Sequence, residues 1–295
     1  MEKSKVYFIK EINSESLIKI YETLNVELKG KVAVKLSSGE PGGHNFLNAK
    51  MIEPLVTKLN GTIVECNTSY GGRRTTSEEH EKVMKEHGFA DIAPIDIMDK
   101  DGDIELPVKE GKHLKVNYVG KHLENYNSIL MLSHFKGHAM GGFGGALKNM
   151  SIGVASREGK AWIHSAGKTR SSEEVWIQGK FPEQNDFLES MAEADEAVID
   201  YMKPENMVYI NVANNLSVDC DCDSNPEAPC MKDIGIFASI DPVAVDQACI
   251  DAIWNSNDEG KEHFKARVER QNGRHILPYA ESLGIGSREY ELIEI

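Results

Sequence analysis

LMLSHFKGHAMGGFGGALKNMSIG, residues Leu130–Gly153, joins an apolar run directly to a segment rich in histidine, lysine and glycine. The apolar part, Ile129–Leu132, is typical of a buried strand. In an open α/β sheet, ligands bind beyond the carboxyl ends of the strands, and polar chemistry is expected there. The stretch therefore predicts a central strand that ends in a functional loop.

Similar apolar runs occur on both sides of this stretch. They alternate with helical patterns, which is typical of strands joined by helical crossovers. The predicted strands are Val6–Ile9, Val32–Leu36, Ile63–Cys66, Ile129–Leu132, Met207–Val212, Ile234–Ala238 and Tyr290–Ile293. We expect an α/β protein with a mostly parallel or mixed sheet and flanking helices.

Two helix starts carry capping patterns. Thr76 and Glu79 have the spacing of a capping box, in which each side chain satisfies a free backbone donor. Asp241 stands just before Pro242, and this order favours Asp as N-cap and Pro as first helical residue. No linker divides residues 1–295, which predicts a single α/β domain. The alternative is two interwoven lobes, of which the second is a small β lobe near residues 92–120.

Composition excludes several classes of protein. The 295 residues carry 33 basic and 47 acidic side chains, a net charge of −14. This charge opposes non-specific binding to nucleic acid or to anionic membrane. The N-terminal segment is too polar for a signal peptide, and no window approaches the roughly 18–20 apolar residues of a membrane span. We therefore expect a cytoplasmic protein, in which a local basic pocket could still bind a small anion.

The segment after Leu132 is the first candidate site. Glycines allow backbone amides to approach a ligand, while histidine and lysine supply proton donors, metal ligands and positive charge. The spacing is neither that of a P-loop nor that of a dinucleotide-binding loop. The candidate catalytic side chains are His134, Lys136, His138 and Lys148, and the candidate ligand-binding residues are Gly141, Gly142, Gly144, Gly145 and Asn149. The alternative is a flexible lid with solvated lysines and structural histidines.

Two other turns follow predicted strands and are expected at the same edge of the sheet. His44 lies after the strand at Val32–Leu36, and Asn67 and Arg73 lie after the next one. We expect these three residues to help bind a cofactor or substrate, with Arg73 and Lys148 neutralising an anionic ligand. Each turn alone is a weak signal, because paired arginines usually form a solvated face.

Cysteines form the second candidate site. Three of the five lie close together, at Cys220, Cys222 and Cys230, and thiolates select zinc, iron or copper. These three are the candidate ligands of a divalent metal ion, zinc or iron; alternatively, Cys220 and Cys222 form a redox pair, or all are reduced surface thiols. Cys66 and Cys249 stand in apolar contexts and are expected in the core.

Four blocks of this sequence resemble the family catalogued as domain of unknown function 362, often described as iron-sulfur-associated proteins. The blocks are VAVKLSSGEPGGHNFL at Val32–Leu47, ECNTSYGGRRTT at Glu65–Thr76, LSHFKGHAMGGFGGALKNMSIGVASREGK at Leu132–Lys160, and CDCDSNPEAPCMKDIGIFASIDPVAVDQACID at Cys220–Asp251. They cover most of residues 31–165 and 207–253. The resemblance implies an α/β domain that often carries a ferredoxin-like insert with two [4Fe–4S] clusters.

This chain departs from the family where the insert is expected. The segment that follows His164 runs into a helical pattern and contains no cysteine up to residue 206. We therefore expect no [4Fe–4S] cluster. Cys230 stands where an aliphatic residue is expected in the family motif.

The sequence leaves three kinds of function open. The first is a metal- or small-anion-binding enzyme or redox protein, in which His134 and His138 are ligands or general acid and base groups. The second is a non-catalytic metal-binding or assembly protein that uses Cys220 and Cys222. The third is a subunit that docks a redox enzyme. The expected partners are a small anionic ligand or substrate and, in the third case, a protein redox partner.

Overall fold

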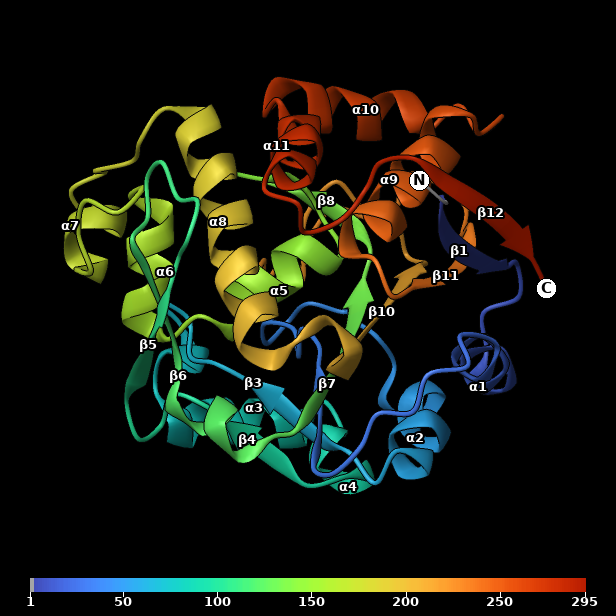
Figure 1. Ribbon diagram of the computed structural model, residues 1–295, viewed down its shortest axis with the longest axis horizontal. Coiled ribbons are helices and arrows are strands. Elements are labelled where there is room, and N and C mark those ends of the chain that lie inside the picture. Colours follow the sequence, from blue (N-terminus) through green and yellow to red (C-terminus); the bar gives the residue numbers. More distant parts are fainter. Residues whose placement is uncertain (1–2) are drawn as a thin grey trace.

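Each predicted apolar run is a strand of one eight-stranded sheet in the computed structural model, which describes residues 3–295 (Figure 1). Its strands are β1 (Ser4–Ile9), β2 (Val32–Lys35), β3 (Thr62–Glu65), β4 (Ile95–Ile97), β7 (Ser128–His134), β10 (Met207–Ala213), β11 (Gly235–Ser239) and β12 (Tyr290–Glu294). The sequence missed β4, because three residues are too few to show a period.

The order of strands across the sheet is β12-β1-β11-β10-β7-β2-β3-β4. The five strands from β10 to β4 are parallel, while β11 runs antiparallel to both β10 and β1. The predicted mixed α/β sheet is therefore confirmed. The reversal at β11 matters for function, since it brings both ends of the connection between β10 and β11 to the carboxyl edge of the parallel strands.

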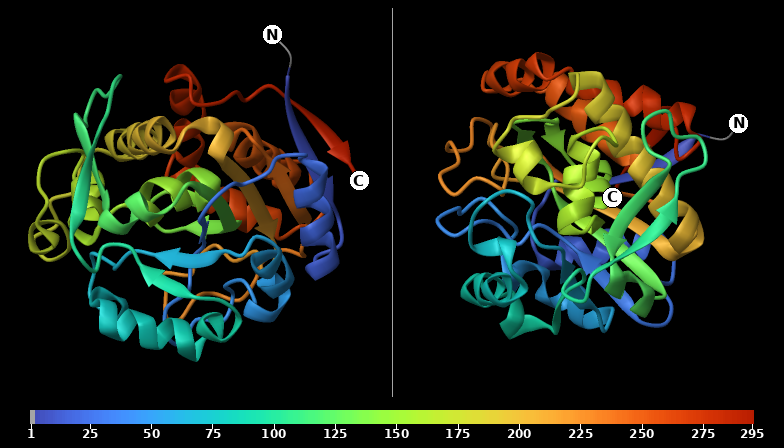
Figure 2. Two further views of the ribbon diagram at one scale, coloured as in Figure 1. Left: turned by 60° about the horizontal axis from the view of Figure 1, so that its bottom comes forward. Right: turned by 90° about the vertical axis from the view of Figure 1, so that its left-hand side faces the viewer.

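Helices cover both faces of the sheet (Figure 2). One face packs against α1 (Ser14–Thr23), α2 (Ala49–Lys58), α3 (Ser77–Glu86) and α4 (Phe89–Ile92). The other packs against α5 (Ala146–Val154) and α9 (Pro242–Trp254). The remaining helices on this side, α6 (Arg157–His164), α8 (Gln184–Met202), α10 (Lys261–Arg270) and α11 (Ile276–Ser282), form an outer layer against these two. A short helix, α7 (Ser172–Trp176), lies beside α6, and 3-10 turns occur at Arg73–Thr75, Lys121–Asn125, Pro204–Asn206 and Gly273–His275. The central strands β11, β10, β7, β2 and β3 are buried on both faces, which explains their continuous apolar runs, whereas the edge strands β1 and β12 are partly exposed.

The two capping patterns have different outcomes. Asp241 accepts hydrogen bonds from the backbone N–H groups of Val243 and Ala244, both at 2.9 Å, so the predicted N-cap of α9 is confirmed. Thr76 occupies the N-cap position of α3, but its side chain makes no cap bond. The predicted capping box is wrong, because Glu79 pairs with Arg73 and Lys82 instead.

Two small hairpins lie outside the main sheet. The first pairs β5 (Asp103–Pro107) with β6 (Val116–Gly120), and Glu193 of α8 accepts hydrogen bonds from three backbone N–H groups of its connecting loop. The second pairs β8 (Lys136–His138) with β9 (Gly142–Gly144). The glycine-rich segment is thus an ordered hairpin that leads into α5. Among residues 3–295, no helix is long and apolar enough to cross a membrane.

Candidate functional site

A cavity of about 260 Å³ opens where the carboxyl ends of β2, β3 and β7 meet. Its walls come from the segments after these three strands, from α5 and α6, and from the connection between β10 and β11. The acidic, basic and sulfur-bearing residues that line it are Lys35, Glu65, Cys66, Arg74, Lys136, His138, Met140, Lys148, Lys160, His164, Asp219, Cys220, Cys222 and Asp223. The location agrees with the rule for ligand sites in α/β sheets.

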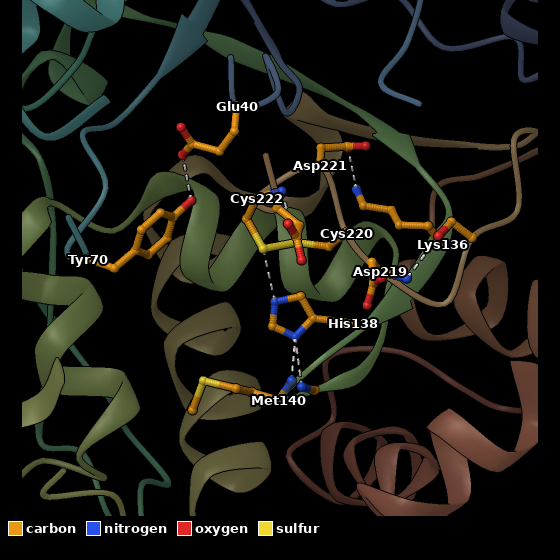
Figure 3. The surroundings of a disulfide bond; sticks show 12 residues. Glu40, Tyr70, Lys136, His138, Met140, Asp219, Cys220, Asp221 and Cys222 are labelled. Atoms are coloured by element: carbon orange, nitrogen blue, oxygen red, sulfur yellow. Dashed lines mark hydrogen bonds and ion pairs between the residues drawn. A yellow bond between two sulfur atoms is a disulfide. The ribbon is translucent and has the colours of Figure 1, made fainter. Parts of the chain in front are cut away.

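Cys220 and Cys222 are joined by a disulfide at one wall of this cavity (Figure 3). Cys220 is buried, with 3% of its surface exposed, whereas Cys222 is partly exposed. The backbone N–H of Cys222 points at the Cys220 sulfur, at 3.0 Å. The two sulfurs are therefore not equivalent, since an incoming molecule meets Cys222 first.

His138 faces the pair from β8. Its Nδ1 accepts hydrogen bonds from the backbone N–H groups of Met140 (3.2 Å) and Gly141 (2.8 Å). A neutral imidazole whose Nδ1 is an acceptor carries its proton on Nε2, and this atom lies 3.8 Å from Cys222 Sγ. Burial and the nearby Lys148 ammonium hold the pKa of His138 well below its usual range, so the ring is neutral. His138 therefore presents an N–H group to the cysteine pair.

Asp221, between the two cysteines, anchors their loop to the sheet. Its buried carboxylate lies 2.8 Å from His134 Nδ1 and 2.9 Å from Lys136 Nζ. Burial alone would raise the pKa of Asp221, but His134 and Lys136 outweigh it and hold the pKa well below its usual range. His134 Nε2 lies 2.7 Å from the carbonyl oxygen of Asn214. Both ring nitrogens of His134 are thus engaged, and its role is to fix the loop.

The opposite wall is held by two buried ion pairs. Lys35 Nζ lies 2.8 Å from Glu65 and also donates to Asn149 Oδ1 at 3.1 Å. Burial raises the pKa of Glu65, yet Lys35, His80 and Arg74 bring it down to about 2. Arg74 donates to Glu40 from Nε at 2.8 Å. These cations are neutralised within the protein.

Lys148 is different. It projects from α5 to the cavity, and no residue among 3–295 supplies its ammonium with a carboxylate partner. Burial, followed by repulsion from Lys136, lowers the pKa of Lys148 to about 7. Near neutral pH this amine therefore exchanges a proton readily, and a bound anion would favour its charged form.

A Lys148→Met variant should be more stable than the parent protein. Methionine has a similar length and removes the cost of burying a charge. The folded pKa of about 7 lies below the unfolded value of about 10.4, so the parent protein gains stability as pH rises through this window. The advantage of the variant should be largest at and below pH 7 and should shrink towards pH 10. Urea unfolding at pH 6 and pH 9.5 measures it; an equal effect at both values would contradict the assignment.

Among residues 3–295, two groups of side chains could hold a metal ion. In the first, His138, Cys220 and Cys222 place ligand atoms within 4.8 Å of one another. In the second, the members are His113, Asp186 and Glu189, near the loop of the β5–β6 hairpin. There, however, Glu189 is already bonded to His113, Lys112 and His275. Neither group includes Cys230, whose thiol donates instead to the carbonyl oxygen of Leu216 at 3.3 Å.

Several residues predicted for the site lie elsewhere. Arg73 is on the surface and pairs with Glu79 and Glu86, because its neighbour in the 3-10 turn, Arg74, is the one that turns inward. His44 is exposed, and Asn67 is buried against Asp99 and Ser77; neither lines the cavity. His134 lies behind the cavity wall rather than on it.

The predicted glycines serve packing more than ligand contact. Gly145 alone of the four lines the cavity, and a Cβ there would collide with Asp246, which caps α5. Gly142 has φ of 80° and lies against Gly273 and Val268. Lys136, His138, Lys148 and Asn149 line the cavity, and Cys220 and Cys222, which the sequence placed in a separate second site, line the same cavity. Cys66 and Cys249 are buried free thiols, which confirms their expected place in the core.

Four further cavity residues were not among the predicted site residues. Glu65 and Lys35 stand inside apolar strand runs, and Lys160 and His164 lie in helix α6. Burial lowers the pKa of His164 to about 4. A signal for Lys35 and Glu65 existed, since two opposite charges inside buried parallel strands are rarely unpaired. His164 stands beside Gly159 and Trp162 in a stretch that could be a site or an ordinary loop, and nothing in the sequence marked Lys160.

A Gly137→Ala variant tests how tightly β8 holds the cysteine loop. Gly137 donates to Ser217 at 2.8 Å, and a Cβ at this position would overlap the backbone of Val218. The loop must then move, at a cost of about 1–3 kcal/mol in stability. Gly71→Ala is the matched control, because a Cβ there meets no atom within 4 Å. Thermal unfolding of both variants measures the difference, and equal melting temperatures would contradict the packing described.

Comparison with known proteins identifies a family. The family model described as Domain of unknown function (DUF362) matches residues 32–251. No protein of curated function matches the chain.

Two solved structures have a similar arrangement of elements. One is the lactate racemase apoprotein from Thermoanaerobacterium thermosaccharolyticum, with a TM-score of 0.49 and 15% identity over 84% of this chain and 56% of that one. The other is a protein from Thermotoga maritima, with a TM-score of 0.46 and 16% identity over 81% of this chain and 57% of that one. This chain thus spans little more than half the length of either protein.

Proposed function

Because this chain belongs to the DUF362 family, whose description assigns no activity, we propose a function from its own side chains. The protein is a redox protein in which Cys220 and Cys222 alternate between disulfide and dithiol beside a cavity for a small anion. The observation that carries the proposal is the position of the disulfide. It forms part of the cavity wall, with the N–H group of His138 directed at its exposed sulfur.

This disulfide is a poor structural staple. It closes a loop of three residues, and the loop-entropy relation gives such a ring about 1.6 kcal/mol, against about 4.7 kcal/mol for a 100-residue loop. The loop is already held by the ion pairs of Asp221 and by hydrogen bonds to Gly137 and Glu40. The small contribution to stability expected of this bond supports a redox role for it.

The surroundings suit both oxidation states. In the reduced protein, a Cys222 thiolate would accept a hydrogen bond from His138 Nε2, and a Cys220 thiolate would accept one from the backbone N–H of Cys222. Hydrogen bonds to the charged form lower a thiol pKa, and thiolate is the reactive species. Lys136 and Lys148 add positive charge along the same wall.

Thiol counting tests the proposal. The chain has five cysteines, so denatured protein should titrate three thiols without reductant and five after reduction. Equilibration in glutathione buffers should move the protein between these states in one reversible two-electron step. Cys230→Ser is the control and should show the same transition with one thiol fewer. Five thiols that persist in oxidising glutathione would overturn the proposal.

A second candidate is a zinc or iron site formed by the same residues. The three ligand atoms of His138, Cys220 and Cys222 favour it. Against it, a histidine that binds metal usually donates its other ring N–H, whereas Nδ1 of His138 is an acceptor. One equivalent of zinc retained by the reduced protein, and lost in both His138→Ala and Cys222→Ser, would favour the metal site over the redox pair. The third candidate is docking to a protein redox partner. Such a partner would contact the exposed rim at Asp223–Asn225.

A further inference from the structure

We propose that the Cys220–Cys222 disulfide exchanges electrons with a small thiol that carries a carboxylate, and that Lys148 and Lys160 hold this carboxylate in the cavity. The thiol is the reductant in one direction and the product in the other. This inference rests on the proposed redox function and adds the substrate class. It follows from which charges in the cavity are neutralised and which are not.

The cavity has a surplus of positive charge. Among the cations that line it, Lys35 pairs with Glu65, Arg74 with Glu40, and Lys136 with Asp221. Lys148 and Lys160 have no carboxylate partner among residues 3–295. Lys160 instead donates to the carbonyl oxygen of Ala155 at 2.6 Å. In a chain with net charge −14, two lysines without carboxylate partners at one cavity favour an anionic ligand.

The acidic groups of the cavity compete little with an anionic ligand, and the buried one, Glu65, is paired with Lys35. Asp219 is paired with Arg267 at 2.9 Å, and Asp223 is exposed to solvent. A ligand whose carboxylate lies between Lys148 and Lys160 would therefore be attracted to the interior. The cavity of about 260 Å³ is near the lower end for ligand pockets, which favours a small molecule.

The sulfur of such a ligand has a single open target. Cys222 is the exposed member of the pair, and Cys220 is buried behind it. The ligand thiolate attacks Cys222 Sγ, the Sγ–Sγ bond breaks, and Cys220 leaves as a thiolate stabilised by the N–H of Cys222.

A second ligand thiolate then completes the reduction. It attacks the ligand sulfur of the mixed disulfide and releases Cys222 as a thiolate next to His138. Two thiols are oxidised to one disulfide, the protein pair gains two electrons, and the two thiol protons end on the two cysteines. In the opposite direction the protein reduces the ligand disulfide.

Three thiols of similar size test the charge preference. We would measure the reduction rate of the oxidised full chain by 3-mercaptopropionate (anionic), 2-mercaptoethanol (neutral) and cysteamine (cationic). Each rate is divided by that of the same thiol with a disulfide-closed peptide of residues 218–223. After this correction, 3-mercaptopropionate should exceed 2-mercaptoethanol by about tenfold, and cysteamine should be slowest.

Two variants locate the preference. Lys148→Gln should abolish most of it, while Lys168→Gln, which changes an exposed lysine outside the cavity, should preserve it. Propionate, which lacks a thiol, should inhibit the anionic thiol in the parent protein; this measurement does not depend on any variant folding. Equal corrected rates for the three thiols, together with no inhibition by propionate, would overturn the inference and leave the redox proposal standing. Absence of the disulfide would overturn the redox proposal itself.

Discussion

An Asp221→Asn variant is expected to lose about 3–5 kcal/mol of unfolding free energy, because removing one partner of a buried ion pair leaves the other charges uncompensated. Asp221 is fully buried and faces two groups, His134 and Lys136. Asparagine keeps the size of the side chain and removes only its charge. Urea unfolding at pH 7 is the measurement.

The control is Asp223→Asn in the same loop. Asp223 is exposed, so its replacement should change stability by no more than about 0.5 kcal/mol. The pH dependence gives a second check. Because the folded pKa of Asp221 is depressed, its contribution is present above the unfolded value of about 3.9 and is lost as pH falls through the folded pKa. The two curves should therefore converge in strong acid; a constant gap would contradict the ion-pair explanation.

The two single cysteine variants are expected to behave in opposite ways. In Cys220→Ser, Cys222 remains open to the cavity and should form a mixed disulfide with an added small disulfide in nearly every molecule. In Cys222→Ser, the remaining Cys220 is buried and should stay almost unmodified. Intact-mass measurement after a brief exposure distinguishes the two outcomes. The asymmetry follows from access, which controls thiol–disulfide exchange.

Cys230→Ser serves as the matched control. Cys230 is partly exposed, but its thiol donates to the Leu216 carbonyl oxygen, and burial raises its pKa. It should react slowly in both variants and not obscure the comparison. Equal modification of Cys220→Ser and Cys222→Ser would show that the exposed and buried roles are misassigned.

The sheet could be predicted because its signals are local. A strand buried on both faces must be apolar throughout, and runs such as Ile129–Leu132 show this directly. The two predicted helix caps show the limit of such local patterns. Asp241 caps α9 with one carboxylate oxygen while Ser4 and Ser287 donate to the other, whereas Glu79 pairs with Arg73 and Lys82 in place of the cap.

The sequence predicted where the site lies but not what each of its side chains does. Beyond the carboxyl ends of strands, the sequence gives the region and not the direction of each side chain. Arg73 and Arg74 are neighbours in one 3-10 turn, yet one meets solvent and the other Glu40. His134 was predicted to be catalytic because nothing in the sequence shows that its ring nitrogen is hydrogen-bonded to Asp221, 87 residues away. Only the tertiary contact distinguishes a structural histidine from a reactive one.

The cysteine pair sits on a connection between strands, and this separates its evolution from that of the scaffold. Substitutions in β7 or β10 must preserve a buried layer, while the rim at Asp223–Asn225 is exposed and can vary with little effect on folding. Substitutions among the roughly twenty residues between β10 and β11 would thus change the reactivity of a relative without changing its sheet. We expect related sequences to diverge in reactivity faster along this connection than in architecture.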